Sequence, residues 1–382
     1  LIGPWAGYFV GWTYWLCWIT IGIADLSAII YYLEFFNGGQ SFSAAGGLLI
    51  STVVILFVLG LNLVTVKLFG EMEFWFAMVK ITAIIVLIGV GLWMIVTGFT
   101  STTGTVASIS NLWTHNGVFP KGLDGFLAGF QIAIFAFVGV ELVGTTAAET
   151  QDPERNLPKA INSIPIRIII FYVLALFVVM CETPWDQINP KVSPFVNIFS
   201  QAGVASAAIV MNLVVLSSVM SSMNSGVFST SRMLFGLSSD QQAPKLFGKL
   251  SKSAVPAKAL IFSSICIFLG AFVQFVYKLK TGTNDEVTAF TLATTLSTIL
   301  FICVWILIMW SYINYRKNRP ELHAQSTFKL PGGVVTCWVV IIFFLATIYF
   351  LALDETTFEA LKVSPIWFVI LAIGYIFYKK KD

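Results

Sequence analysis

The chain contains little charge and almost no histidine. Only 11% of its 382 residues are Asp, Glu, Lys or Arg, two are histidine and five are cysteine. The cysteines are scattered, with no C-x-x-C pair and no His/Cys cluster, so neither a metal site nor a disulfide framework is indicated. His115 and His323 both fall between apolar segments, so the intramembrane Ser/His or His/Asp set of a membrane-embedded enzyme is missing. We expect no cofactor and no catalysis.

Long apolar runs make up most of the chain. The sequence is 57% hydrophobic, and apolar stretches of about 18 or more residues recur along it, the length that an α-helix needs to cross a membrane. A soluble α/β fold cannot hold so many runs in its core. The sequence therefore predicts an all-α membrane protein with a single domain over residues 1–382. The ten expected spans are 5–33, 44–64, 75–98, 125–149, 168–183, 199–230, 259–277, 286–313, 331–353 and 364–378.

The basic residues are unevenly distributed between the expected loops. If the spans alternate across the membrane, sixteen of the 22 Lys and Arg residues fall on one side and in the carboxyl tail, five on the other, and Lys80 within a span. Cytoplasmic loops carry the excess of Lys and Arg, so both chain ends are predicted to be cytoplasmic. Two inner connections are expected, an amphipathic linker at 64–74 and a loop at 150–167 that is broken by three prolines. These basic loops are solvated and are no nucleic-acid footprint.

A glycine and an acid interrupt the fourth expected span. Gly139 and Glu141 lie in the apolar stretch FAFVGVE at 135–141. A carboxylate at membrane depth is costly and normally faces a bundle interior, a cavity or a proton path. A broken helix at Gly139 would leave the backbone groups of 135–138 without helical partners, able to meet a ligand. The alternative is a packing glycine and a structural acid that pairs with a neighbouring helix.

Other polar residues in the spans allow two readings each. Lys80 either reaches the inner interface along its aliphatic stem or points inward, where a desolvated lysine can gain and lose a proton. Asp25 suits a pairing or interfacial role better than a substrate role. The sixth expected span carries a polar stripe that favours helix packing, with one or two members that could contact a ligand or ion. This stripe consists of Ser217, Ser218, Ser221, Ser222, Asn224, Ser225, Ser229, Thr230 and Ser231.

Four segments identify a family resemblance. They are FAFVGVELVGTTAAETQDPERNLPKAINSIPIR at 135–167, GEMEFWFAMVKI at 70–81, NSGVFSTSRMLFGL at 224–237 and AVPAKAL at 254–260. They resemble the bacterial amino acid transporter family of the amino acid–polyamine–organocation (APC) superfamily, and the likeness covers essentially the whole chain. The resemblance implies the LeuT-type inverted-repeat transporter fold of twelve helices. The chain aligns from the third of these, so about ten of the twelve are expected, truncated at the N-terminus.

The resemblance also implies site residues. In the family the helix that corresponds to the fourth expected span unwinds at FAFVG, which ends here at Gly139. Phe135, Phe137 and Val138 would offer backbone carbonyls to the substrate ammonium, and Phe135 would sit at the position of a gating aromatic. The family's glycine-rich broken helix, whose amides bind the substrate carboxylate, would precede Leu1, so this half of the site is not expected in the chain.

A second group of residues corresponds to the family's coupling machinery. Glu141 matches the glutamate near the gate and proton path, and Lys80 matches the lysine that replaces the sodium ion of sodium-coupled relatives. Ser221, Asn224 and Ser225 fall near that vacated cation site.

The resemblance implies proton symport of small neutral amino acids, namely D-alanine, D-serine and glycine, across the bacterial inner membrane. The expected partners are the amino acid, a proton and the lipid bilayer, with the oligomeric state left open. A permease of the same family for lysine, aromatic amino acids or proline stays an alternative. So does a channel or a membrane sensor that does not transport.

Overall fold

The fold is almost entirely helical. The structure, a computed structural model, describes residues 2–64, 66–145, 152–189, 192–282 and 286–379. Within these ranges the only β-pairing is an isolated antiparallel bridge between Thr100 and Val106, and the rest of the non-helical chain is turns and loops. The all-α membrane architecture that the apolar runs predict is therefore confirmed.

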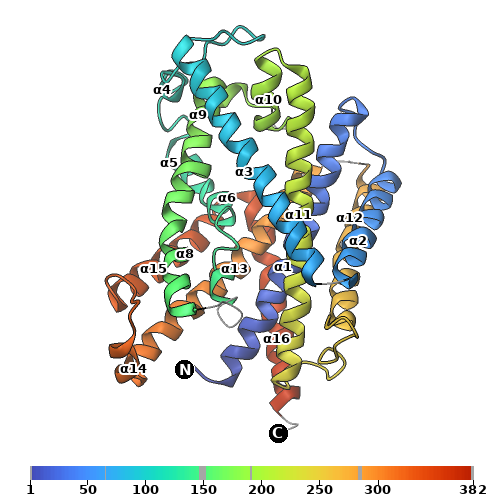
Figure 1. Cartoon of the computed structure of the whole chain (residues 1–382), viewed down its shortest axis with the longest axis vertical. Helices are drawn as coiled ribbons and strands as arrows, with labels where there is room; N and C mark the ends of the chain where they lie inside the picture. Colours follow the sequence, from blue (N-terminus) through green and yellow to red (C-terminus); the bar gives the residue numbers. More distant parts are fainter. Residues whose placement is uncertain (1, 65, 146–151, 190–191, 283–285, 380–382) are drawn as a thin grey trace.

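Nine helices of the described residues are long and apolar enough to cross a membrane. Eight are single elements: α1 (Pro4–Glu34), α2 (Ala44–Val64), α3 (Val66–Thr97), α11 (Ala205–Ser239), α12 (Ala257–Thr281), α13 (Glu286–Asn318), α15 (Val334–Leu351) and α16 (Glu355–Lys379). The ninth joins α8 (Pro153–Ile168), a π-helical turn (Ile169–Leu174) and α9 (Ala175–Glu182). Both termini lie at the same end of the bundle (Figure 1), which is called the terminal end below.

Short helices complete the fold. They are α4 (Asn111–Thr114), α5 (Gly122–Ala128), α6 (Phe130–Phe135), α7 (Leu142–Thr145), α10 (Pro194–Gln201), α14 (Pro320–Gln325) and the 3₁₀ turns Phe35–Asn37 and Trp185–Gln187. The expected span at 125–149 is thus a run of short helices, and its last residues lie outside the described part of the chain. The expected span at 199–230 is also divided, because α10 ends at Gln201 and α11 begins at Ala205.

Two expected inner connections are helical instead. Within 64–74, α3 begins at Val66 and continues into the membrane-spanning part without a break. In the expected loop at 150–167, Pro153 occupies the first turn of α8, where its missing N–H costs nothing, and the helix continues through Pro158 and Pro165. The three prolines therefore mark a helix start and two tolerated interior positions rather than a loop.

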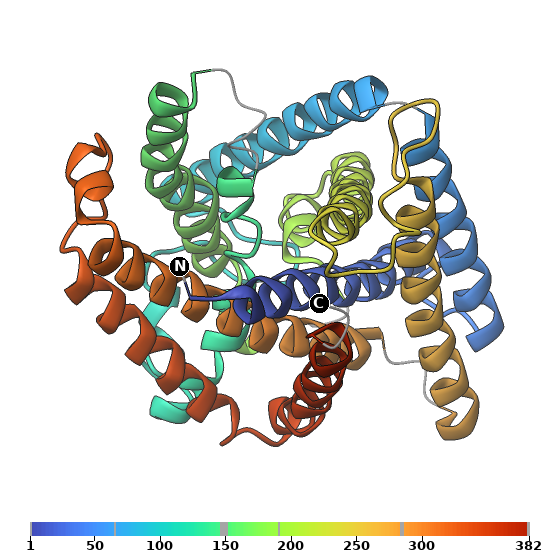
Figure 2. The ribbon, with the colours of Figure 1, turned by 90° about the horizontal axis from the view of Figure 1, so that it is seen from below.

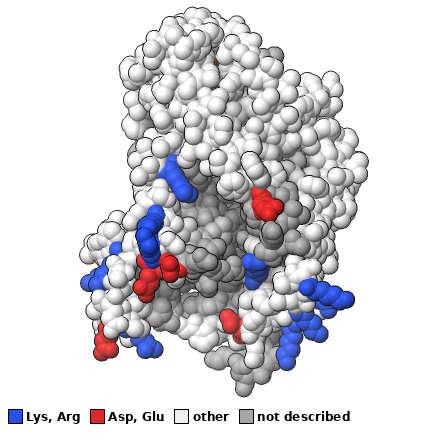
Figure 3. Space-filling view, in the orientation of Figure 1, with Lys and Arg blue, Asp and Glu red and all other residues white. Residues whose placement is uncertain are grey.

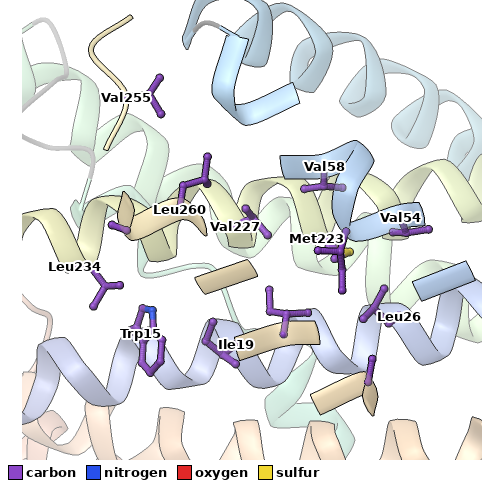
Figure 4. Close-up of a cluster of buried hydrophobic side chains, with 14 of the residues drawn as sticks. Trp15, Ile19, Leu26, Val54, Val58, Met223, Val227, Leu234, Val255 and Leu260 are labelled. Carbon is purple, nitrogen blue, oxygen red and sulfur yellow. The ribbon is translucent and has the colours of Figure 1, made fainter. Parts of the chain in front are cut away.

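Helix α1 runs through the middle of the bundle and packs along both α13 and α11 (Figure 2). On one side its apolar residues meet α2, α11 and α12 in a buried cluster, in which Trp15, Ile19 and Leu26 face Met223 and Val227 (Figure 4). On another side Tyr14, Cys17 and Trp18 pack against Leu300 and Phe301 of α13. A central helix that is buried on several faces reads as apolar all round, as the sequence of α1 does.

The outer surface is apolar, as a lipid-facing surface must be. Large side chains on α3 and α15 are exposed in the structure, including Trp75 at 67%, Val96 at 86% and Val339 at 60%. In the view of Figure 3 the Lys, Arg, Asp and Glu side chains gather in the half that carries the termini, and the upper half is almost free of charge. This distribution is the one expected for a protein that spans a membrane.

Candidate functional site

The interruption that the sequence predicts at Gly139 is present. Helix α6 ends at Phe135, α7 begins at Leu142, and Gly139 between them has a φ of 98°, a backbone conformation that residues with a Cβ rarely adopt. A Cβ at Gly139 would meet only atoms 4.0 Å away, so the backbone angle and not lack of space calls for glycine. Residues 136–141 are called the break below.

The amides of the break are not left without partners, contrary to the expectation. Phe137 N–H donates to the Ile134 carbonyl at 3.0 Å, and Val138 N–H donates to the Phe135 carbonyl at 3.0 Å. These bonds span three residues instead of the four of an α-helix, because the chain tightens as it leaves α6. A carbonyl oxygen has two lone pairs, so the Phe135 oxygen can still accept a hydrogen bond from a ligand.

Glu141 folds back over the break and ties it to α1. Its Oε2 accepts the Gly139 N–H at 3.1 Å, and its Oε1 accepts the Tyr14 hydroxyl at 3.0 Å. The indole of Trp305 on α13 lies beside the same carboxylate. Glu141 therefore connects the break with α1 and stands next to α13, the three elements that would have to move together or apart around a site.

Buried polar contacts hold α6 against α13. Gln131 is 6% exposed and Thr294 is fully buried, and the Gln131 amide donates to the Thr294 hydroxyl at 3.2 Å. The Thr298 hydroxyl contacts the Gln131 carbonyl at 3.4 Å. Such bonds are favoured inside a membrane bundle, where water cannot replace them. They hold the first turn of α6, the helix that precedes the break, against α13.

The two aromatic residues of the predicted substrate site point into different spaces. Phe135 packs edge-on against Phe290 of α13, with ring centroids 6.3 Å apart, and lines a pocket on the side of α1 and α11. Phe137 stacks on Tyr172, with centroids 5.8 Å apart and ring planes 5° apart, and lines a second pocket beside Trp305. Val138 packs into the cluster around Trp18. Phe135 and Phe137 therefore line two different pockets.

Lys80 faces the bundle interior and lies in a hydrogen-bonded network. Its Nζ donates to the Ser221 hydroxyl at 3.0 Å, and Ser221 in turn donates to Glu73 Oε2 at 2.8 Å. The other Glu73 oxygen accepts the Asn224 amide at 3.1 Å, and Asn62 of α2 donates to Asn224 Oδ1 at 2.8 Å. The network thus joins α2, α3 and α11.

The remaining predicted residues stand apart from this network. Ser225 is half-buried one helical turn beyond Ser221, and no hydrogen bond of the network described above includes it. Lys80 and Glu141 have no hydrogen-bond partner in common among the described contacts. Asp25 of α1 is close enough to Lys80 for their charges to interact. The structure therefore brings Lys80, Ser221 and Asn224 together and keeps Glu141 in a separate cluster.

Glu73, Asn62 and Tyr14 are not among the site residues expected from the sequence. Glu73 had a usable signal, because it precedes Lys80 by seven residues and so lies two turns away on the same helix face. Asn62 also had one, since it is a lone amide in an apolar span. Tyr14 is 127 residues from Glu141, and nothing in its local sequence marks that contact. Within the described residues no three His, Cys, Asp or Glu side chains gather in a way that could hold a metal ion.

Comparison with known proteins gives a consistent result. The whole chain, residues 1–382, matches the family described as amino acid permease. It is 56% identical over 381 residues to the D-serine/D-alanine/glycine transporter of Escherichia coli K12, an alignment that covers 100% of this chain and 79% of that protein. It is 44% identical to the amino-acid permease AapA of Bacillus subtilis 168, over 98% of this chain and 78% of AapA. It is 36% identical to the probable threonine/serine transporter YbxG of the same organism, again over 98% of this chain and 78% of that protein.

Proposed function

Because the chain belongs to the amino acid permease family, a family of transporters and not of enzymes, we propose that it imports D-alanine, D-serine and glycine with a proton. The observation that carries the proposal is the break at Gly139, which Glu141 links to α1. Broken helices at membrane depth are the binding elements of secondary transporters, because their backbone groups can meet a ligand there. The identity of 56% to a D-serine/D-alanine/glycine transporter supports the choice of substrates.

The proposed substrate site is built from the break and the end of α6. The carbonyls of Phe135, Phe137 and Val138 would face the substrate ammonium, and Gly139 would let the backbone bend around it. Glu141 would couple movement of the break to α1 through its hydrogen bond with Tyr14 at 3.0 Å. Rocking of one group of helices against the other around this point would open the site alternately to the two sides of the membrane.

The proposed coupling site is the network around Lys80. The Ser221 hydroxyl accepts from Lys80 and donates to Glu73, so the three groups form one connected chain. A proton can pass from the Lys80 ammonium to the Ser221 oxygen while the Ser221 proton passes to Glu73. The result is a neutral amine, an intact hydroxyl and a protonated carboxyl. Glu73 lies two helical turns nearer than Lys80 to the terminal end of the bundle. The hydrogen-bonded chain from Lys80 to Glu73 therefore runs toward the side predicted to be cytoplasmic.

The proposed location is the bacterial inner membrane, with residues 1–382 as one membrane domain and the carboxyl end in the cytoplasm. The bias of Lys and Arg toward one set of loops supports this orientation. Cysteines introduced in the full-length protein by Lys121→Cys and Lys362→Cys should react with an impermeant reagent from outside, and Lys249→Cys only from inside. Labelling of position 121 from inside would contradict the orientation.

A competition assay tests the proposed substrates. In cells that lack their own glycine uptake, the full-length protein should take up labelled glycine. Unlabelled D-alanine and D-serine should compete, and lysine, tryptophan and proline should not. Equal competition by one of the bulky or basic amino acids would favour the alternative permease assignments. No uptake of any amino acid would contradict the proposed function.

A further inference from the structure

Helices α1, α6, α11 and α13 and the segment before α10 line an open pocket of about 520 Å³. Its volume falls within the range of about 300–1,000 Å³ that is usual for small-molecule sites. The lining includes Asp25, Phe135, Ser193, Ser222 and Glu286. Phe135 also ends α6, so this pocket, called the Asp25 pocket below, opens directly beside the break.

Asp25 is the chemically unusual member of the pocket. Asp25 is only 8% exposed, and its Oδ2 atom has no hydrogen-bond partner among the described residues. The Ser222 hydroxyl lies beside the same carboxylate. A buried carboxylate oxygen that is left without a donor is costly, so the site favours a ligand that brings donors and positive charge.

Of the two acids in the pocket lining, Asp25 is the one for which no ion pair is described. The second acid of the lining, Glu286, forms a buried ion pair with Lys278. Lys80 interacts with Asp25 through its charge, but no described hydrogen bond joins the two. No Lys or Arg is among the described residues that line the pocket. The lining of the pocket therefore contains a buried carboxyl oxygen for which no hydrogen-bond partner is described.

A second buried oxygen lies in the same lining. Ser193 is 7% exposed, and its hydroxyl also has no described hydrogen-bond partner. An ammonium group has three donors and no acceptor, so it can satisfy a carboxylate oxygen and a hydroxyl oxygen at once. A carboxylate or a neutral apolar group could not.

We propose that the Asp25 pocket binds the ammonium group of the transported amino acid, with Asp25 as its charge partner, before the amino acid reaches the break. This inference rests on the proposed function. It assigns to Asp25 a role in substrate binding, where the sequence pattern favoured a pairing or interfacial one. Phe135 lines the pocket and directly precedes the break in the chain, so it would control passage between the two.

The first test uses the purified full-length protein and two half-substrates. Ethylammonium carries the amine of alanine without its carboxylate, and propionate carries the carboxylate without the amine. A ligand that binds only the folded protein raises its melting temperature. Ethylammonium should raise the melting temperature of the wild type more than sodium chloride does at equal ionic strength, and propionate should not. Absence of an ethylammonium effect would overturn the proposal.

Variants assign the effect to Asp25. In Asp25→Asn the ethylammonium effect should disappear, and the glycine KM should rise about tenfold, since a charge-assisted hydrogen bond is replaced by a neutral one. Glu182→Gln, a buried acid that does not line the pocket, is the matched control and should keep both values. An unchanged ethylammonium effect in folded Asp25→Asn would refute the site.

A second measurement covers the case in which Asp25→Asn does not fold. Ser193→Cys places a thiol in the pocket while Asp25 stays intact. A methanethiosulfonate reagent with an ammonium group should modify this thiol faster than one with a sulfonate group, and glycine should protect it. Equal or inverse charge preference would contradict the proposal. If the wild type transports no amino acid but ethylammonium binding is present and depends on Asp25, the cation site stands and the proposed function fails.

Discussion

The Tyr14 hydroxyl donates a hydrogen bond of 3.0 Å to Glu141, and this bond joins two segments that are 127 residues apart. Glu141 uses its other oxygen to accept the Gly139 N–H inside the break. The same carboxylate thus stabilises the irregular backbone and fastens it to α1. Any movement of the break relative to α1 has to lengthen or exchange this bond.

Loss of the Tyr14 hydroxyl should slow transport. Tyr14→Phe removes one of the two described donors of Glu141, a loss of about 1.5–3 kcal/mol for a bond to a charged group, or at least about tenfold in an equilibrium. We expect the maximal rate of glycine uptake to fall by about tenfold, with a smaller change in KM. Tyr8→Phe is the control, because Tyr8 is a buried residue of the same helix that packs on Tyr375 and Tyr378. Equal rates in Tyr14→Phe and the wild type would show that this bond has no role in transport.

Gly139 should not tolerate a side chain. At a φ of 98°, Gly139→Ala introduces backbone strain of about 1–3 kcal/mol, although the space for a methyl group is present. We expect the break to shift and glycine uptake to be lost or strongly reduced. Gly144→Ala, in α7 with no atom within 4 Å of the added Cβ and no positive φ, should transport normally. A fully active Gly139→Ala variant would contradict the role of the break.

The different orientations of Phe135 and Phe137 give a paired prediction. Phe135→Ala should enlarge the Asp25 pocket and admit amino acids larger than serine, because selection by an apolar wall rests on steric exclusion. Phe137→Ala removes the stacking on Tyr172 and leaves that pocket unchanged, so substrate size should not change. Uptake of leucine and phenylalanine by the two variants decides the point. A broader range in Phe137→Ala alone would place the substrate on the other side of the break.

Lys80 and Glu73 should be required for the coupling of glycine transport to the proton gradient more than for the exchange of glycine across the membrane. Lys80→Ala removes the proton donor, and Glu73→Gln the proton acceptor, of the hydrogen-bonded path through Ser221. Both variants should lose accumulation of glycine driven by a pH gradient and should keep part of the exchange of internal for external glycine. Glu71→Gln is the control, since Glu71 is exposed two residues earlier on the same helix. Normal pH-driven accumulation in either Lys80→Ala or Glu73→Gln would exclude the proposed proton path.

Much of this arrangement follows from local sequence. A run of about 20 apolar residues specifies a spanning helix, and nine of the ten expected spans overlap a helix of the required length among the described residues. The interruption at Gly139 is also a local property, because a glycine beside an intramembrane acid weakens the helix at that point. Lys80 pointing inward agrees with the cost of placing a charge in lipid.

The errors concern properties that local sequence does not contain. Three prolines suggested a loop at 150–167, but one of them lies in the first turn of α8 and the helix continues through the other two. Periodicity gave no way to see that Phe135 and Phe137, two residues apart, would point to opposite sides of the break. The partners Tyr14–Glu141 and Asn62–Asn224 lie 127 and 162 residues apart, so only the folded chain reveals them.

Uptake of labelled glycine by the full-length protein in proteoliposomes tests the central claim most directly. With the outside acidified, the account predicts accumulation of glycine above equilibrium. It also predicts that a protonophore abolishes this accumulation and that excess D-alanine or D-serine suppresses it. Glycine uptake that does not respond to the pH gradient, or the absence of glycine uptake in vesicles with correctly folded protein, would contradict it.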